Sequence, residues 1–142
     1  MDPVSTASHP ILVIDDHDDT RNLLVELLEI EGFTVLGAAS GEQALALVRS
    51  HRPCMILLDL GLPDIAGLEL VLRLRAEANG AGTPIYALSG FTNLRSAALA
   101  AGIDGFLIKP VLGSELRGIV AQHCAPPPPP AALTPMPIPP SA

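Results

Sequence analysis

The sequence predicts an α/β domain with a doubly wound, five-stranded parallel sheet and five helices. Five short apolar runs alternate with segments of helical spacing, an order that is typical of repeated βα units. Three of the runs are apolar without interruption, which indicates strands covered on both faces of the sheet. With 142 residues, 49% of them hydrophobic, the chain can bury one core of this kind but is too short for two.

The strands are predicted from these runs. The runs at 11–14, 55–58 and 85–88 are continuous, and shorter apolar runs at 34–36 and 106–108 complete the set. Because only 3% of the residues are aromatic, the core is expected to consist of Leu, Ile, Val and Ala.

The helices are predicted from apolar positions at helical spacing after a capping or turn residue. The first carries a leucine stripe, begins at an N-cap formed by Asp18 or Asp19, and stops at Gly32. An Ala-rich helix near 93–101 stops at Gly102. The other helices are expected to follow Ser40 and Gly67 and to begin near Ser114, with apolar positions Ala44, Leu45, Val48, Leu68, Val71, Leu72, Leu116, Ile119 and Val120.

Proline marks the predicted domain boundary. Nine of the 15 prolines lie between Pro126 and Pro140, and no charged residue follows Arg117. Such a segment is expected to form an extended polyproline II spacer, with a docking peptide for a proline-binding domain as the alternative. The expected organisation is an N-terminal extension at 1–9, the domain at 10–123 and a Pro-rich tail or linker at 124–142.

Composition excludes several classes of protein. Eight basic and 15 acidic residues give a net charge of −7, which argues against direct nucleic-acid binding. No apolar run approaches the ~20 residues that span a bilayer, and the first residues do not resemble a signal peptide, so a soluble cytoplasmic protein is expected. Cys54 and Cys124 show no spacing of a disulfide framework or metal site, and Cys54 is expected to be a small core residue.

Polar residues stand where four of the predicted strands end. The first strand runs into Asp15 and Asp16, the third into Asp59, the fourth into Ser89 and the fifth into Lys109. Parallel sheets bind their ligands beyond the carboxyl ends of the strands, so these side chains are expected to share one site. His17, Asp18 and Asp19 extend the acidic segment. His17 is expected to be a solvated loop residue, and the two aspartates are expected to stabilise the start of the first helix.

These stretches resemble the receiver domain of two-component response regulators, the CheY-like superfamily. The resemblance covers residues 10 to 123, with its motifs in order at 11–16, 56–64, 88–90 and 109–110. It implies a flavodoxin-like sheet with strand order 2-1-3-4-5.

The resemblance implies a Mg²⁺ site and a phosphoacceptor. With that order, the third strand lies about 4.8 Å from the first, so three carboxylates come close enough to repel unless a cation lies between them. Mg²⁺, which prefers oxygen ligands, is expected to bind Asp16 directly, Asp15 partly through water, Asp59, and the backbone carbonyl of Gly61. Asp59 is then the nucleophile that takes a phosphoryl group from a phosphohistidine.

Four further residues complete the implied site. The hydroxyl of Ser89 and the ammonium of Lys109 are expected to bind the phosphoryl oxygens, the lysine bridging roughly 10 Å from the fifth strand. Phe106 stands at the switch aromatic of the family, with a plain core residue as the alternative. Pro110 is expected to be structural, with a cis peptide bond before it.

The predicted function is therefore that of a phosphoacceptor domain without a separate substrate, not an enzyme. Its expected partners are a sensor histidine kinase or histidine phosphotransfer protein and a downstream output protein. The output protein would contact the face formed by the Ala-rich helix, the fifth strand and the last helix.

Three alternative functions require other residues or fewer of these. An aspartyl-phosphate hydrolase of the haloacid-dehalogenase type would need an Asp-x-Asp pattern after the first strand, where this chain has Asp15-Asp16-His17. An FMN carrier would need a phosphate loop there, and the acids would repel the phosphate. A pseudo-receiver that binds partners without phosphorylation would have no need of the intact site.

Overall fold

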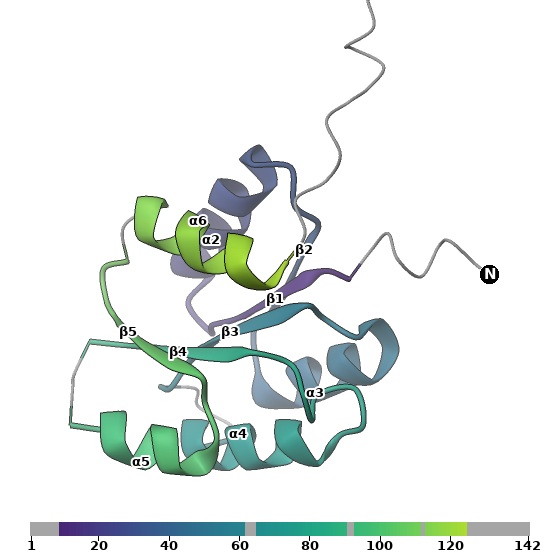
Figure 1. Ribbon diagram of the computed structural model, residues 1–142, viewed down its shortest axis with the longest axis vertical. Coiled ribbons are helices and arrows are strands. Elements are labelled where there is room, and N and C mark those ends of the chain that lie inside the picture. The colour runs from purple at the N-terminus through teal and green to yellow at the C-terminus, as the bar shows by residue number, and fades with distance from the viewer. Residues whose placement is uncertain (1–8, 62–64, 91–92, 112, 125–142) are drawn as a thin grey trace, which may run out of the picture.

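The computed structural model describes residues 9–61, 65–90, 93–111 and 113–124. Within these residues the predicted fold class is confirmed: a five-stranded sheet, with all neighbouring pairs parallel, has the order β2-β1-β3-β4-β5. Figure 1 shows three layers, with α2 and α6 on one side of the sheet and α3, α4 and α5 on the other. The domain is thus wound in both directions from β1.

The strands lie close to their predicted places. Their bounds are β1 Ile11–Ile14, β2 Val35–Ala38, β3 Met55–Asp59, β4 Ile85–Ser89 and β5 Gly105–Ile108. The second strand is longer than its apolar run because pairing with β1 continues to Ala38, which lies opposite Ile14. Backbone hydrogen bonding, rather than hydrophobicity, therefore sets where this strand ends.

The helices that join the strands are α2 Asp18–Ile30, α3 Gly41–His51, α4 Gly67–Ala76, α5 Arg95–Ala101 and α6 Gly113–His123. Ser40 caps α3 through its side chain, which accepts a 3.1 Å hydrogen bond from the backbone N–H of Gln43. Gly102, with φ of 117°, ends α5 in the left-handed conformation that the sequence predicted.

One capping prediction is wrong. His17, not Asp18 or Asp19, is the N-cap residue of α2, and it makes no side-chain cap. Both aspartates lie in the first turn, where their charges still interact favourably with the helix dipole. The last helix begins near Ser114 as predicted, since the first residue of α6 is Gly113.

Two apolar clusters explain why the strands are continuously hydrophobic. Alternate strand residues face opposite sides, so Leu12 and Ile14 join the cluster under α3, α4 and α5, whereas Ile11 and Val13 join the cluster under α2 and α6. Gly67 is part of this packing, because a Cβ there would lie 2.7 Å from backbone atoms of Leu60. These contacts fix the strand ends from which the polar residues emerge.

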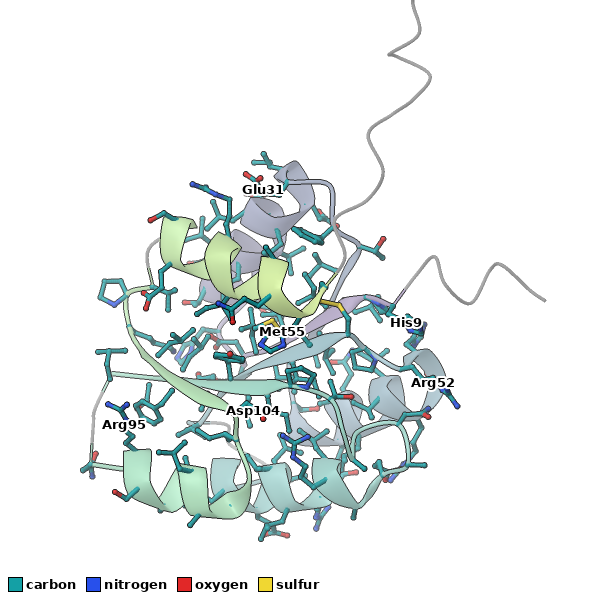
Figure 2. All side chains as sticks on the ribbon, viewed as in Figure 1. His9, Glu31, Arg52, Met55, Arg95 and Asp104 are labelled. Atoms are coloured by element: carbon teal, nitrogen blue, oxygen red, sulfur yellow. A yellow bond between two sulfur atoms is a disulfide. The ribbon has the colours of Figure 1, made fainter. Side chains whose placement is uncertain are left out.

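A disulfide bond between Cys54 and Cys124 corrects the prediction that the cysteines form no bridge. Their Cα atoms lie 5.5 Å apart and 70 residues apart in sequence. The bond joins the residue before β3 to the residue after α6 and appears in yellow in Figure 2. Cys124 was expected in the tail, yet it is buried among the residues under α6. The rest of the expected tail, and all of the expected N-terminal extension except His9, lie outside the described residues.

Candidate functional site

The carboxyl edge of the sheet brings the predicted site residues together. Asp15 and Asp16 follow β1, and Asp59 and Ser89 are the last residues of β3 and β4. The register keeps the strand ends level, with Ile14 opposite Leu58. Ligand atoms of Asp15, Asp16, His17 and Asp59 all lie within 4.8 Å of one another. We call these four residues the acid cluster.

Asp15 and Asp59 are buried and Asp16 is half-buried, and their carboxylates are incompletely hydrogen-bonded. Asp15 is fully buried, and its Oδ1 accepts a 2.9 Å bond from the backbone N–H of His17. Asp59 Oδ1 accepts a 3.1 Å bond from the N–H of Gly61. Asp15 Oδ2 and Asp16 Oδ1, by contrast, are buried atoms without a hydrogen-bond partner among the described residues. Buried carboxylate oxygens in this state are costly unless a cation binds them.

Lys109 supplies the positive charge nearest to the cluster. Its Nζ lies 3.4 Å from Asp59 Oδ2 and 3.7 Å from Asp15 Oδ2. The Lys109 backbone N–H donates to the carbonyl of Ser89, and the following bond to Pro110 is cis, as the resemblance implied. One ammonium pairs with two of the three clustered carboxylates, so the site retains net negative charge and favours a divalent cation.

A cavity of about 260 Å³ opens beside these groups. Its lining includes Asp59, Gly61, Ser89 and Lys109. A ligand in this cavity would meet a carboxylate, an ammonium and a hydroxyl together.

His17 is the residue whose place in the site was missed. Its side chain is 68% exposed, as a loop residue would be, but its Nδ1 lies 3.2 Å from Asp15 Oδ1 and 3.4 Å from Asp16 Oδ1. The available signal was the spacing, because an aspartate side chain often bonds the backbone N–H two residues later. His17 therefore positions the Asp15 carboxylate.

Phe106 lies apart from the charged groups. It is half-buried, pairs with Ala87 across β4 and β5, and packs against the apolar cluster under α5. This packing fits the core alternative and is compatible with the switch prediction, which stays a prediction. Of the second motif, residues 62–64 lie outside the described residues.

The donor set fits Mg²⁺. Hard divalent cations bind carboxylate and carbonyl oxygens, and Mg²⁺ usually takes few protein carboxylates and several waters. The two unpartnered buried oxygens of Asp15 and Asp16 are ligands of this kind. Asp59 and Gly61 border the same cavity, so they could complete the protein's share.

Doubly wound domains bind their ligands beyond the carboxyl ends of the strands, where this chain has clustered carboxylates, a lysine and a hydroxyl. The family model of the response regulator receiver domain matches residues 11–121. The chain belongs to this family.

Individual relatives agree with this assignment. The chain is 39% identical over 127 residues to a 14.6 kDa protein of Leptolyngbya boryana named for the sodA1 3' region, with 88% of this chain and 97% of that protein covered. It is also 39% identical over 137 residues to the virulence sensor protein BvgS of Bordetella pertussis, covering 88% of this chain and 11% of BvgS.

A solved structure provides the comparison for the metal. The receiver domain of sensor histidine kinase PA1611 from Pseudomonas aeruginosa PAO1 was crystallised with a magnesium ion coordinated in its active-site cleft. It is 30% identical, has a TM-score of 0.76, and covers 82% of this chain and 98% of that one. The chain thus spans a complete receiver domain but only a small part of a sensor protein such as BvgS. None of the described helices is long and apolar enough to cross a membrane.

Proposed function

We propose that this receiver domain accepts a phosphoryl group on Asp59 from a phosphohistidine of a sensor histidine kinase or histidine phosphotransfer protein, in a Mg²⁺-dependent reaction. The observation that carries the proposal is the position of Asp59 Oδ2. It lies 3.4 Å from the ammonium of Lys109, in the acid cluster and beside an open cavity. A structural aspartate would need only a cap or turn partner.

The metal would be held by Asp15, Asp16, Asp59 and the Gly61 carbonyl. When bound, Mg²⁺ supplies the positive charge that neutralises the clustered carboxylates and the transferred phosphoryl group. Asp15 and Asp16 present the unpartnered oxygens, and His17 orients Asp15.

In the transfer step, a carboxylate oxygen of Asp59 attacks phosphorus. The P–N bond of the donor breaks and its electron pair returns to the imidazole, leaving an aspartyl phosphate. Lys109 moves from the Asp59 carboxylate to a phosphoryl oxygen, which it is long enough to reach from the end of β5. The Ser89 hydroxyl, which borders the same cavity, donates to another phosphoryl oxygen.

The output would follow from the same contacts. Turning the Ser89 hydroxyl toward the phosphoryl group would free space toward which the Phe106 ring moves. This shift would change the face of α5, β5 and α6, where Leu99 and Ile108 are 45% and 43% exposed. A downstream protein in the cytoplasm would bind there, whereas the net charge of −7 opposes nucleic acid.

The test is intact mass after exposure to acetyl phosphate with and without Mg²⁺. The wild-type protein should gain one phosphoryl group only with the metal, and Asp59→Asn should gain none. Asp18→Asn is the matched control, because Asp18 is an exposed acid in the first turn of α2 and outside the acid cluster. Equal mass gain in wild type and Asp59→Asn would place the phosphoryl group elsewhere. No gain in the folded wild type would favour a pseudo-receiver.

A further inference from the structure

The amino edge of the sheet, opposite the acid cluster, contains a second pocket. Its volume is about 440 Å³, and it lies where β3 and β4 begin and α6 ends. Its lining includes His9, Arg52, Cys54, Thr83 and His123. Figure 2 shows His9 and Arg52 on the same side of the molecule as the disulfide bond. The pocket therefore gives solvent molecules a route to one end of that bond.

The two cysteine residues differ in exposure. Cys54 is half-buried and lines the pocket. Cys124 is only 3% exposed and packs in the apolar cluster under α6. An incoming thiol would therefore meet the sulfur of Cys54 and leave Cys124 as the departing sulfur.

The charge around the pocket favours an anionic visitor. Arg52 is an exposed permanent cation, and none of the described lining residues carries a carboxylate, although the chain has a net charge of −7. His9 Nδ1 lies 3.1 Å from the Arg52 carbonyl oxygen, which joins two of the lining residues.

We propose that Cys54 and Cys124 form a reversible redox switch, which a small anionic thiol of the glutathione class opens by attack on Cys54 through this pocket. The thiolate forms a bond to Cys54 Sγ, the Cys54–Cys124 bond breaks, and its electron pair goes to Cys124 Sγ, which takes a proton. A second thiolate attacks the sulfur of the first thiol in the mixed disulfide and releases Cys54, which also takes a proton. Two thiols are oxidised to their disulfide while the protein gains two electrons and two protons.

The switch controls the end of α6. Cys124 directly follows this helix, so the bond is the covalent link between its last turn and β3. A side-chain contact there is the 3.0 Å hydrogen bond between His123 Nε2 and the hydroxyl of Tyr86. Opening the bond should loosen the last turn of α6 and the point where the following segment begins. The acid cluster, at the other edge, should be unaffected.

The first experiment measures which sulfur reacts. Full-length Cys124→Ser and Cys54→Ser are each incubated, folded, with oxidised glutathione, and mixed disulfides are followed by intact mass. Cys54, free in Cys124→Ser, should react at least about tenfold faster than Cys124, free in Cys54→Ser. Equal rates, or faster reaction at Cys124, would contradict the route through the pocket.

A second arm tests the charge. Arg52→Gln should slow opening of the disulfide bond by reduced glutathione several-fold, and should slow opening by cysteamine, whose attacking thiolate form carries no net charge, far less. Arg49→Gln is the control, because Arg49 is also exposed at the end of α3 but does not line the pocket. Equal slowing by both substitutions, or none by Arg52→Gln, would overturn the anionic-thiol assignment.

A third arm separates a switch from a structural bond. Wild-type protein in glutathione buffers of graded potential should interconvert without denaturant, and amide exchange at residues 120–124 should rise in the reduced form while residues 15–17 stay unchanged. A bond that opens only in urea, or exchange that is equal in both forms, would overturn the proposal. Mass gain from acetyl phosphate should be the same in both redox forms, so a failure of phosphorylation would count against the proposed function alone.

Discussion

The two edges of the sheet differ in how their polar groups are satisfied. At the carboxyl edge, two buried carboxylate oxygens lack hydrogen bonds, and one lysine pairs with two of the three clustered carboxylates. At the amino edge, Arg75 donates to the carbonyls of Gly80 and Gly102 at 3.0 and 2.8 Å, and pairs with Asp104 at 2.7 Å. Asp104 in turn accepts from the N–H of Ile85. The carboxyl edge therefore carries negative charge that a cationic ligand would stabilise. The polar groups of the amino edge named above are instead paired within the protein.

This difference indicates that one edge of the sheet provides the candidate site and the other edge stabilises the domain. Like charges held close together lower the free energy of unfolding. The domain stays folded only if contacts in other regions contribute enough stability to offset this cost. The disulfide bond and the Arg75 contacts lie at the edge away from the acid cluster, so they stabilise the domain without filling the site. Substitutions that remove contacts or charges at one edge at a time test this difference.

The largest expected effect is loss of the disulfide bond. Replacing both cysteines, Cys54→Ser with Cys124→Ser, should lower the free energy of unfolding by about 4 kcal/mol, because the bond closes a loop of 70 residues. Urea unfolding under oxidising conditions measures the change, and reduced wild type is the control and should lose a similar amount. A loss below about 1 kcal/mol would mean that the disulfide bond at the amino edge does not supply the stability that offsets the repulsion in the acid cluster.

The next largest effect is expected at Arg75. Arg75→Met should lower the free energy of unfolding by about 3 kcal/mol, because it leaves several backbone carbonyls and Asp104 without their donor. Arg73→Met is the control: Arg73 lies two residues away on α4, and among the described residues its ion pairs are exposed ones with Glu42 and Glu69, so its loss should cost less than about 0.5 kcal/mol. Equal losses in urea unfolding would contradict the special role of Arg75.

Matched substitutions of aspartate should have opposite signs at the two edges. Asp59→Asn removes one charge from a repelling cluster and should raise stability by about 1 kcal/mol in the absence of divalent cations. Asp104→Asn weakens a charged pair with Arg75 and should lower stability by about 1 kcal/mol. Thermal unfolding with a chelator present measures both. Destabilisation of similar size by both changes would show that Lys109 already compensates the acid cluster.

The difference between the edges also explains what the sequence could predict. Apolar runs followed by Asp15, Asp16, Asp59, Ser89 and Lys109 are local patterns, and parallel strands necessarily bring their ends to one edge. The fold class and the gathering of these residues were therefore predictable. The roles of Gly61 and Phe106 depend on the resemblance and remain predictions.

The contacts at the amino edge were harder to predict, because no local sequence pattern marks them. Cys54 and Cys124 lie 70 residues apart, and only the packing of α6 over the start of β3 brings them together. The contacts of Arg75 likewise join α4 to two loops before β4 and β5, and no spacing in the sequence marks them. The missed N-cap of α2 has a local cause, because the Asp15 side chain bonds the N–H of His17 and so shifts the first turn.

The smallest effect is expected at an exposed pair of the amino edge, Arg49 and Glu77. The hydrogen bond from Arg49 lowers the pKa of Glu77, and the nearby positive charge acts in the same direction. A carboxyl whose pKa is lower in the folded state stabilises the fold above its ordinary pKa, and this contribution is lost as pH falls through the lowered value. Arg49→Gln should therefore lower the melting temperature slightly at neutral pH, and the difference from wild type should vanish in acid. A carboxyl titration by NMR should show the midpoint of Glu77 rising toward its ordinary value in Arg49→Gln. An unchanged midpoint would show that solvent already screens the interaction between Arg49 and Glu77. The stability of the amino edge would then come from Arg75 and the disulfide bond.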